Sequence, residues 1–189
     1  MGKKGHLFII SAPSGAGKST IVMAILRKDP ALRYSISYTT RPPRSNERDG
    51  TDYYFVSYAA FHKKIDSGEL VEWAEVHGHL YGTSARLLDD SLQLGYDILF
   101  DIDVAGARKL YSKYPEATLV FIAPPSMEEL KRRLAKRGAD SAEVIEQRMK
   151  NAKAEMAQAE RYHHVVVNDD LDNALSEIEA IIRKARLHG

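Results

Sequence analysis

The chain has 189 residues, no cysteine, and 27 basic against 26 acidic side chains, so its net charge is +1. This length suffices for one domain with a sizeable core, and the missing cysteines exclude disulfides, thiolate metal sites and thiol catalysis. A charge near zero argues against a general nucleic-acid or membrane-surface binder, so a polyanion would have to meet a local basic cluster. We expect no membrane span, because no apolar stretch is long enough, and a cytoplasmic location, because no targeting segment is recognisable.

The first half of the chain predicts a strand, a turn and a helix, followed by a different kind of structure. Residues 6–11 are an apolar run, and residues 18–28 carry apolar positions at helical spacing. Residues 34–83 then contain the short strand-like pieces YSISYTT, DYYFVS and LVEWAEV, with one short helix over 58–67. This middle segment predicts a small antiparallel insertion.

Strands and helices alternate again in the second half. Strands are expected at 96–103, 118–123 and 164–168, and helices at 104–113, 127–137, from about 140 to 162, and from 171 onward. Such alternation predicts a three-layer α/β fold with a parallel central sheet. The expected division is a core of residues 1–33, 94–125 and 161–189, with excursions at 34–93 and 126–160.

The stretch SAPSGAGKST, residues 11–20, joins the first strand to the first helix. Backbone N–H groups of a glycine-rich turn and the positive end of the helix dipole can hold a phosphate chain, and larger side chains at 15–17 would block its approach. Lys18 can reach the outer phosphates, and the Ser19 hydroxyl can ligate Mg²⁺. The predicted ATP-binding turn comprises Ala12, Pro13, Ser14, Gly15, Ala16, Gly17, Lys18, Ser19 and Thr20.

This turn departs from the strict P-loop pattern GxxxxGK[ST], because Ala12 stands where the first glycine is expected. The competing interpretation is an ordinary glycine-rich connection between a strand and a helix. A P-loop alone also fits a GTPase, an ATPase motor or a kinase. The chain shows neither the guanine signature of GTPases nor a strand that ends in the acidic pair of ATPase motors.

Four further motifs narrow the class: SYTTRPPR at 37–44, DYYF at 52–55, VEWAEVHGHLYGTS at 71–84 and DID at 101–103. In this order and spacing they resemble the guanylate kinases, which transfer a phosphoryl group from ATP to GMP. The resemblance continues to VNDDLDNA at 167–174. It implies that 34–93 is a GMP-binding insertion and 126–160 a helical lid. It also implies Mg²⁺ as cofactor and ATP and GMP as substrates, with acceptance of dGMP left open.

The resemblance implies eight GMP-binding side chains: Ser37, Arg41, Arg44, Tyr53, Glu72, Tyr81, Thr83 and Asp103. Two guanidinium groups and two phenols suit a phosphate dianion. The carboxylate of Glu72 can accept from the N1–H and the amino group of guanine together, a donor pair that adenine lacks. The competing interpretations are a solvated turn for the arginines, packing for the tyrosines, an outward-facing strand residue for Glu72 and a helix N-cap for Asp103.

For the transfer step the resemblance implies the catalytic residues Lys18, Arg41, Asp101, Arg133, Arg137 and Arg148. Arg133 and Arg137 are four residues apart on a predicted helix, so they share a face from which they could contact ATP and neutralise the moving phosphoryl group. Asn168 and Asp169 match the adenine pocket. Asp101 is a candidate partner for Lys18 or, with Ser19, for Mg²⁺. A solvated basic helix face and a capped turn are the competing interpretations.

The phosphate of a nucleoside monophosphate is already anionic near neutral pH. Phosphoryl transfer to its oxygen therefore needs alignment and charge neutralisation, and no general base. Two other functions stay open from the sequence. One is a binding module of the same fold without catalysis, and the other is a kinase for another small acceptor, such as a phosphorylated sugar. The sequence does not give the oligomeric state.

Overall fold

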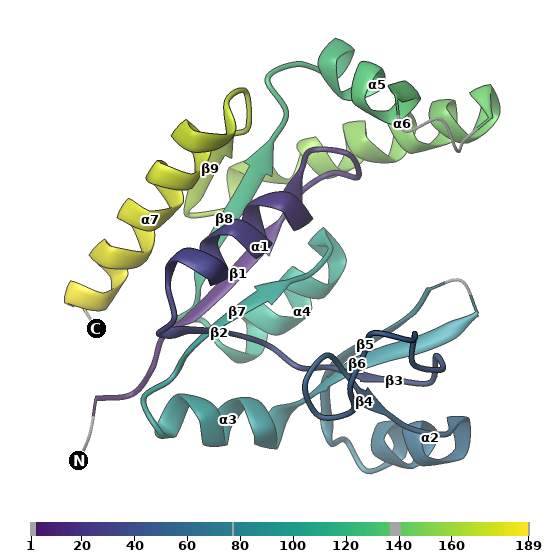
Figure 1. Ribbon diagram of the computed structural model, residues 1–189, viewed down its shortest axis with the longest axis vertical. Helices are drawn as coiled ribbons and strands as arrows, with labels where there is room; N and C mark the ends of the chain where they lie inside the picture. Colours follow the sequence, from purple (N-terminus) through teal and green to yellow (C-terminus); the bar gives the residue numbers. More distant parts are fainter. Residues whose placement is uncertain (1–2, 77, 137–140, 189) are drawn as a thin grey trace.

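The computed structural model describes residues 3–76, 78–136 and 141–188. Its centre is a five-stranded sheet in the order β2-β7-β1-β8-β9, in which every neighbouring pair is parallel (Figure 1). The strands are β1 Leu7–Ser11, β2 Leu32–Tyr34, β7 Asp97–Asp101, β8 Thr118–Ala123 and β9 His164–Val167. The predicted α/β class with a parallel central sheet is confirmed.

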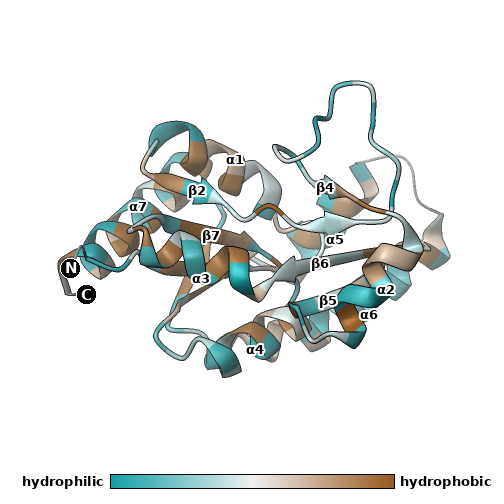
Figure 2. Ribbon diagram, turned by 90° about the horizontal axis from the view of Figure 1, so that it is seen from below, coloured by the Kyte–Doolittle hydropathy of each residue, from teal (hydrophilic) through white to brown (hydrophobic). Residues whose placement is uncertain are grey.

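Helices cover both faces of this sheet. Helices α1 (Lys18–Lys28) and α7 (Leu171–His188) pack on the face that receives Phe8 and Ile10 of β1. Helices α3 (Ala85–Gln93) and α4 (Val104–Lys113) pack on the face that receives Leu7 and Ile9. Because successive side chains of a strand point to opposite faces, a central strand with helices on both sides must be apolar throughout. Figure 2 shows this as an apolar β7 between helices whose colour alternates along their turns.

A second sheet in the order β4-β3-β6-β5 lies beside the core, toward the lower right of Figure 1. Its strands are β3 Tyr38–Thr39, β4 Tyr54–Phe55, β5 Leu70–Val76 and β6 His79–Ser84, and helix α2 (Tyr58–Asp66) packs on them. The fully buried Phe61 of α2 contacts Leu70 and Leu80. The β3–β6 and β5–β6 pairs are antiparallel as predicted, whereas β3 and β4 pair in parallel because the long segment between them brings the chain back in the same direction.

Two elements at the edges of the insertion differ from the sequence prediction. The piece YSISYTT is not one strand: Tyr34 ends β2 in the central sheet, and β3 starts at Tyr38 in the second sheet. Helix α3 was not expected at all. The hydroxyl of Ser84 caps it by accepting from the backbone N–H of Leu87 at 3.4 Å, and its buried residues join the central core. The predicted boundary between the excursion of residues 34–93 and the core segment of residues 94–125 stays a prediction.

Helices α5 (Met127–Lys136) and α6 (Ala142–Met156) form a pair at the top of Figure 1, packed through Leu130, Leu134 and Ala152. The hydroxyl of Ser126 accepts from the backbone N–H of Glu129 at 3.0 Å and so caps the start of α5. Ser141 caps α6, and its side chain accepts from the backbone N–H of Val144. The helix ends at Met156, and a 3₁₀ turn (Ala159–Arg161) follows, so α6 is shorter than predicted. Within the described ranges, no helix is long and apolar enough to cross a membrane.

Candidate active site

The turn of residues 12–17 leaves the carboxyl end of β1 and leads into α1. Gly15 and Gly17 both have φ of 93°, a conformation that side chains disfavour. The N–H of Ala16 donates to the carbonyl of Pro13 at 3.1 Å, which closes the turn. Gly17 is the N-cap of α1 and offers no side-chain cap, so the positive end of this helix faces the turn. A turn of this geometry can bind an anion, and Ala12, in place of the first glycine, is buried within it.

Lys18 lies over the carboxyl end of β7. Its Nζ donates to the carbonyl oxygen of Ile102 at 3.1 Å and forms an ion pair with the carboxylate of Asp101. The two side chains are 21% and 15% exposed, so the pair is largely shielded from water. The strand order explains the pairing, because β1 and β7 are neighbours and their carboxyl ends meet at one edge of the sheet. Ser19 and Thr20 are exposed on the first turn of α1.

A cavity of about 270 Å³ opens between this edge and the second sheet. Seven of the residues predicted from the sequence line it: Lys18, Ser37, Tyr53, Glu72, Tyr81, Asp101 and Asp103. Three lining residues of interest were missed, namely Tyr34, Trp73 and Lys109. Lys18, at the end of the predicted phosphoryl-donor turn, therefore lines the same cavity as residues of the predicted acceptor site.

Glu72 is held at this cavity by a chain of hydroxyl groups. Glu72 and Thr83 are directly opposite each other across β5 and β6. The hydroxyl of Thr83 donates to Glu72 Oε1 at 3.0 Å, and Ser37 Oγ lies 3.0 Å from Thr83 Oγ1. Burial raises the pKa of Glu72 above its ordinary value, the Thr83 hydrogen bond lowers it, and the nearby Asp103 raises it further. Glu72 is a partly buried carboxylate whose Oε1 is held by Thr83 and whose Oε2 has no hydrogen-bond partner among the described residues, so it is well suited to accept from a donor-rich ligand.

Asp103 follows β7 and caps α4. Its Oδ1 accepts from the backbone N–H of Gly106 at 2.7 Å, so the capping interpretation of this residue is confirmed. The residue also lines the cavity beside Glu72. Its predicted contact to a base is compatible with capping, because one carboxylate can accept several hydrogen bonds.

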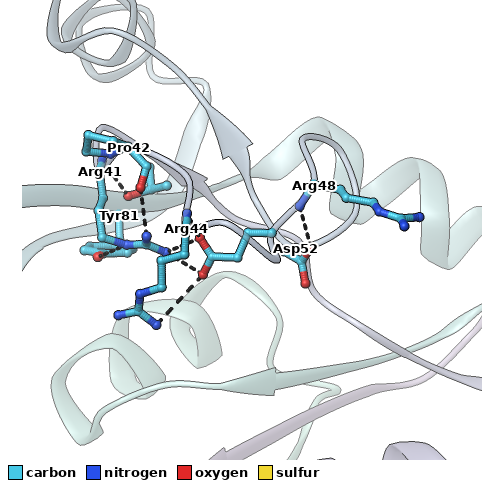
Figure 3. Close-up of polar contacts among 8 residues, drawn as sticks. Arg41, Pro42, Arg44, Arg48, Asp52 and Tyr81 are labelled. Carbon is cyan, nitrogen blue, oxygen red and sulfur yellow. Dashed lines mark hydrogen bonds and ion pairs between the residues drawn. The ribbon is translucent and has the colours of Figure 1, made fainter.

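Figure 3 shows the arginine cluster of Arg41 and Arg44 beside Tyr81, which lines the cavity. Arg41 Nε donates to the hydroxyl of Tyr81 at 3.2 Å, and Arg41 Nη2 donates to both carboxylate oxygens of Glu47 at 2.8 and 3.0 Å. The Arg41 guanidinium carbon lies 5.5 Å from the ring centre of Tyr53, whose ring meets that of Tyr81 edge-on at 5.9 Å. Burial raises the pKa of Tyr53, so this phenol keeps its proton and can donate. Arg44 is mostly exposed.

Among the predicted lid residues, Arg133 is connected to the P-loop through Asn168. Arg133 Nε donates to Glu129 Oε1 at 2.8 Å, and Arg133 Nη2 donates to the carbonyl of Asn168 at 3.0 Å. The side-chain amide of Asn168 is buried and donates to the carbonyl of Ala16 at 2.7 Å. Arg148 is half-buried on α6, Asp169 is exposed, and Arg137 lies outside the described residues. Asn168 thus contacts the P-loop itself, which the sequence did not predict.

A larger cavity of about 550 Å³ lies between α4 and the end of α6. Its lining is mostly apolar and includes Ala107, Leu119 and Tyr162, and it shares Asp103 with the smaller cavity. It contains none of the other residues predicted to bind nucleotides. The smaller cavity, with its lysine, phenols and carboxylates, is therefore the candidate active site.

The fold and the site together define a P-loop nucleotide kinase, because a parallel sheet carries the glycine-rich turn and the cavity beside Lys18 is lined by residues of a second sheet. Residues 4–185 match the family model described as guanylate kinase. The guanylate kinase of Geobacter sulfurreducens is 47% identical over 182 residues, which cover 96% of this chain and 90% of that protein. That of Shewanella sp. (strain MR-7) is 48% identical over 190 residues, covering 100% and 92%.

A solved structure gives the same result. The crystal structure of guanylate kinase from Anaplasma phagocytophilum has a TM-score of 0.74 and 34% identity, with 97% of this chain and 87% of that chain covered. The chain belongs to the guanylate kinase family.

Proposed function

We infer that this chain transfers the γ-phosphoryl group of ATP to GMP and produces ADP and GDP, a reaction of purine nucleotide metabolism. The observation that carries this inference is the cavity in which Glu72, with its Thr83 and Ser37 hydroxyl partners, lies opposite Lys18 of the P-loop. Membership of the guanylate kinase family supports the same reaction. The cytoplasmic location expected from the sequence stays a prediction.

We assign the acceptor nucleotide to the cavity beside the second sheet. Guanine donates its N1–H and amino group to Glu72, with Ser37, Thr83 and Asp103 as further polar contacts. The phosphate binds between Arg44 and the phenols of Tyr53 and Tyr81, close to Arg41. The separation of the exposed Arg44 from the partly buried Glu72 suits a ligand that has a polar base at one end and an anion at the other.

We assign the triphosphate of ATP to the turn of residues 12–20 and to Lys18. The positive end of α1 and the exposed hydroxyls of its first turn are suited to phosphate oxygens. The arginines of α5 and α6, namely Arg133, Arg137 and Arg148, are proposed to neutralise the charge of the phosphoryl group in transit. Asn168 and Asp169 are proposed to flank the adenine. The division into core, GMP-binding insertion and lid follows from these assignments.

Mg²⁺ is the cofactor that we propose to accompany ATP. Ser19 offers a hydroxyl on the first turn of α1, and Asp101 offers a carboxylate at the end of β7, both of them oxygen ligands of the kind Mg²⁺ prefers. Within the described ranges no group of three or more His, Cys, Asp or Glu could hold a metal ion alone. A nucleotide-borne Mg²⁺ needs only one or two protein oxygens, because phosphates and waters complete its shell, and it would supply phosphate charge neutralisation.

A panel of acceptors tests the proposed function. ADP release from Mg·ATP is measured with GMP, dGMP, AMP and UMP under identical conditions. We expect GMP to exceed AMP by at least about 100-fold in kcat/KM, because adenine leaves the partly buried carboxylate of Glu72 without donors. Equal rates with AMP would refute the assignment of Glu72, and ADP release that needs no acceptor would make the chain an ATPase instead.

A further inference from the structure

Almost all hydrogen-bond donors of Arg41 are already in use within the described residues. Nε donates to Tyr81 Oη at 3.2 Å, Nη1 to the carbonyl of Pro42 at 2.8 Å, and Nη2 to the two oxygens of Glu47 at 2.8 and 3.0 Å (Figure 3). A guanidinium group has five N–H donors, so about one of them is left for an incoming phosphate. Arg41 therefore cannot donate two hydrogen bonds to that phosphate while it keeps these partners.

Glu47 is the residue that determines this arrangement. Besides both contacts from Arg41 Nη2, its Oε2 accepts from the backbone N–H of Arg44 at 2.8 Å, and Arg44 Nη1 lies 3.9 Å from its Oε1. The side chains of Arg41 and Glu47 are 14% and 11% exposed, whereas that of Arg44 is 73% exposed. The hydrogen bond from Arg41 and then that from the Arg44 amide hold the pKa of Glu47 below its ordinary value, so it is a fixed anion at neutral pH.

The arrangement has a consequence for Tyr81. A phenol has one proton to donate and lone pairs that accept. Because Arg41 Nε donates to Tyr81 Oη, the phenolic proton points away from Arg41 and is left for a ligand in the cavity assigned to GMP, which Tyr81 lines. Arg41 thus acts on the cavity largely through the donor that it creates at Tyr81.

We propose that Glu47 is a positioning residue for the acceptor phosphate: it fixes the guanidinium of Arg41, which in turn fixes Tyr81 as a hydrogen-bond donor. This inference rests on the proposed function. A long arginine side chain that is already immobilised loses less freedom when the substrate binds. Glu47 also offsets one of the two arginine charges, so the exposed Arg44 is the main cation left to meet the phosphate.

The opposite role for Glu47 would be that of a competitor. A carboxylate that occupies Arg41 also competes with the phosphate for it, and its removal would then tighten GMP binding. The two roles predict opposite changes in the KM for GMP, so one kinetic measurement distinguishes them.

The experiment compares E47A and E47Q with the unchanged chain in steady-state kinetics and in calorimetric titration with GMP. For E47A we expect the KM and Kd for GMP to rise about tenfold or more and kcat to stay within about threefold. The reason is that the lost interaction stabilises bound GMP and the transition state equally. The KM of E47Q for GMP should lie between those of the unchanged chain and E47A, since the amide oxygen of glutamine can still accept from Arg41. E69A is the matched control, because Glu69 pairs with Lys64 at 2.7 Å in the same insertion. A lower KM, or an equal fall in kcat, overturns the proposal.

A double-mutant cycle separates positioning from a general effect on the loop. In an R41A background, E47A should change the KM for GMP by less than about twofold, because the group through which Glu47 acts is gone. A change as large as that in the unaltered background overturns the proposal. If the unchanged chain phosphorylates GMP and E47A matches it, only this inference fails. If the unchanged chain does not phosphorylate GMP, the proposed function fails first.

Discussion

Replacement of Glu72 by glutamine is the most direct test of how the site recognises its base. The change keeps the size and the oxygen that accepts from Thr83 at 3.0 Å, but it removes the negative charge. It also places an N–H₂ group where the second carboxylate oxygen lies. Guanine would then meet a donor instead of an acceptor at one of its two donor positions.

The size of the effect follows from counting the hydrogen bonds that change. A hydrogen bond to a charged group contributes about 1.5–3 kcal/mol, so two of them amount to about 3–6 kcal/mol. The amide oxygen of E72Q can still accept one hydrogen bond from guanine, but without the negative charge this bond is weaker. With tenfold for each 1.36 kcal/mol, we expect kcat/KM for GMP to fall by roughly 10²–10⁴. The value for AMP should change by less than about tenfold, because AMP never used these contacts.

The same variant has a predicted effect on stability with the opposite sign. Burial raises the pKa of Glu72 in the folded chain, so the folded state favours the protonated form. The free energy of unfolding therefore falls as the pH rises through the folded pKa, and the full cost is present at neutral pH. E72Q carries no such cost, so its urea midpoint should exceed that of the unchanged chain at pH 7, and the difference should shrink toward pH 4. GMP kinetics that stay within threefold, or a lower midpoint at pH 7, would refute the reasoning.

Three further changes test other parts of the molecule. K18M should abolish turnover, by about a thousandfold or more, while GMP binding measured by calorimetry stays within about threefold; near-normal turnover would contradict the role of Lys18. In G17A the new Cβ would lie 2.3 Å from Asn168 Nδ2, on a backbone whose φ of 93° disfavours a side chain. The free energy of unfolding, measured by urea denaturation, should therefore fall by about 2–4 kcal/mol, and an unchanged value would argue against this packing. F61A removes the fully buried Phe61 and should cost about 3–5 kcal/mol by the same assay, with unfolding of the second sheet seen in hydrogen exchange.

The elements with strong periodicity could be predicted from the sequence, and a short edge strand could not. Helix α1 and the strands β1, β7 and β8 carry continuous or periodic apolar residues over their whole length. Strand β2 has three residues, of which only Leu32 is buried. It is a strand because it pairs with β7, a contact between distant parts of the chain that no local pattern records.

The same missed strand explains a missed site residue. Tyr34 ends β2 and lines the candidate active site. The carboxyl ends of parallel strands meet at the ligand edge of a sheet, so recognition of β2 would have indicated Tyr34. The acceptor site itself could be predicted only through the resemblance to guanylate kinases. Its residues meet because the register sets Glu72 opposite Thr83 and Tyr81 opposite Thr39, and register does not follow from spacing along the chain.

The small residues of the P-loop show that one sequence feature can have two physical causes. From the sequence, the glycines at 15 and 17 are explained by the approach of a phosphate. In the structure a Cβ on Gly15 would lie 2.8 Å from Leu134 Cδ2 of α5, and one on Gly17 would meet the Asn168 amide that holds Ala16. Both positions also need a positive φ. The glycines thus allow the P-loop to pack against α5 and Asn168, and Arg133, which donates to the Asn168 carbonyl, is positioned by the same contact.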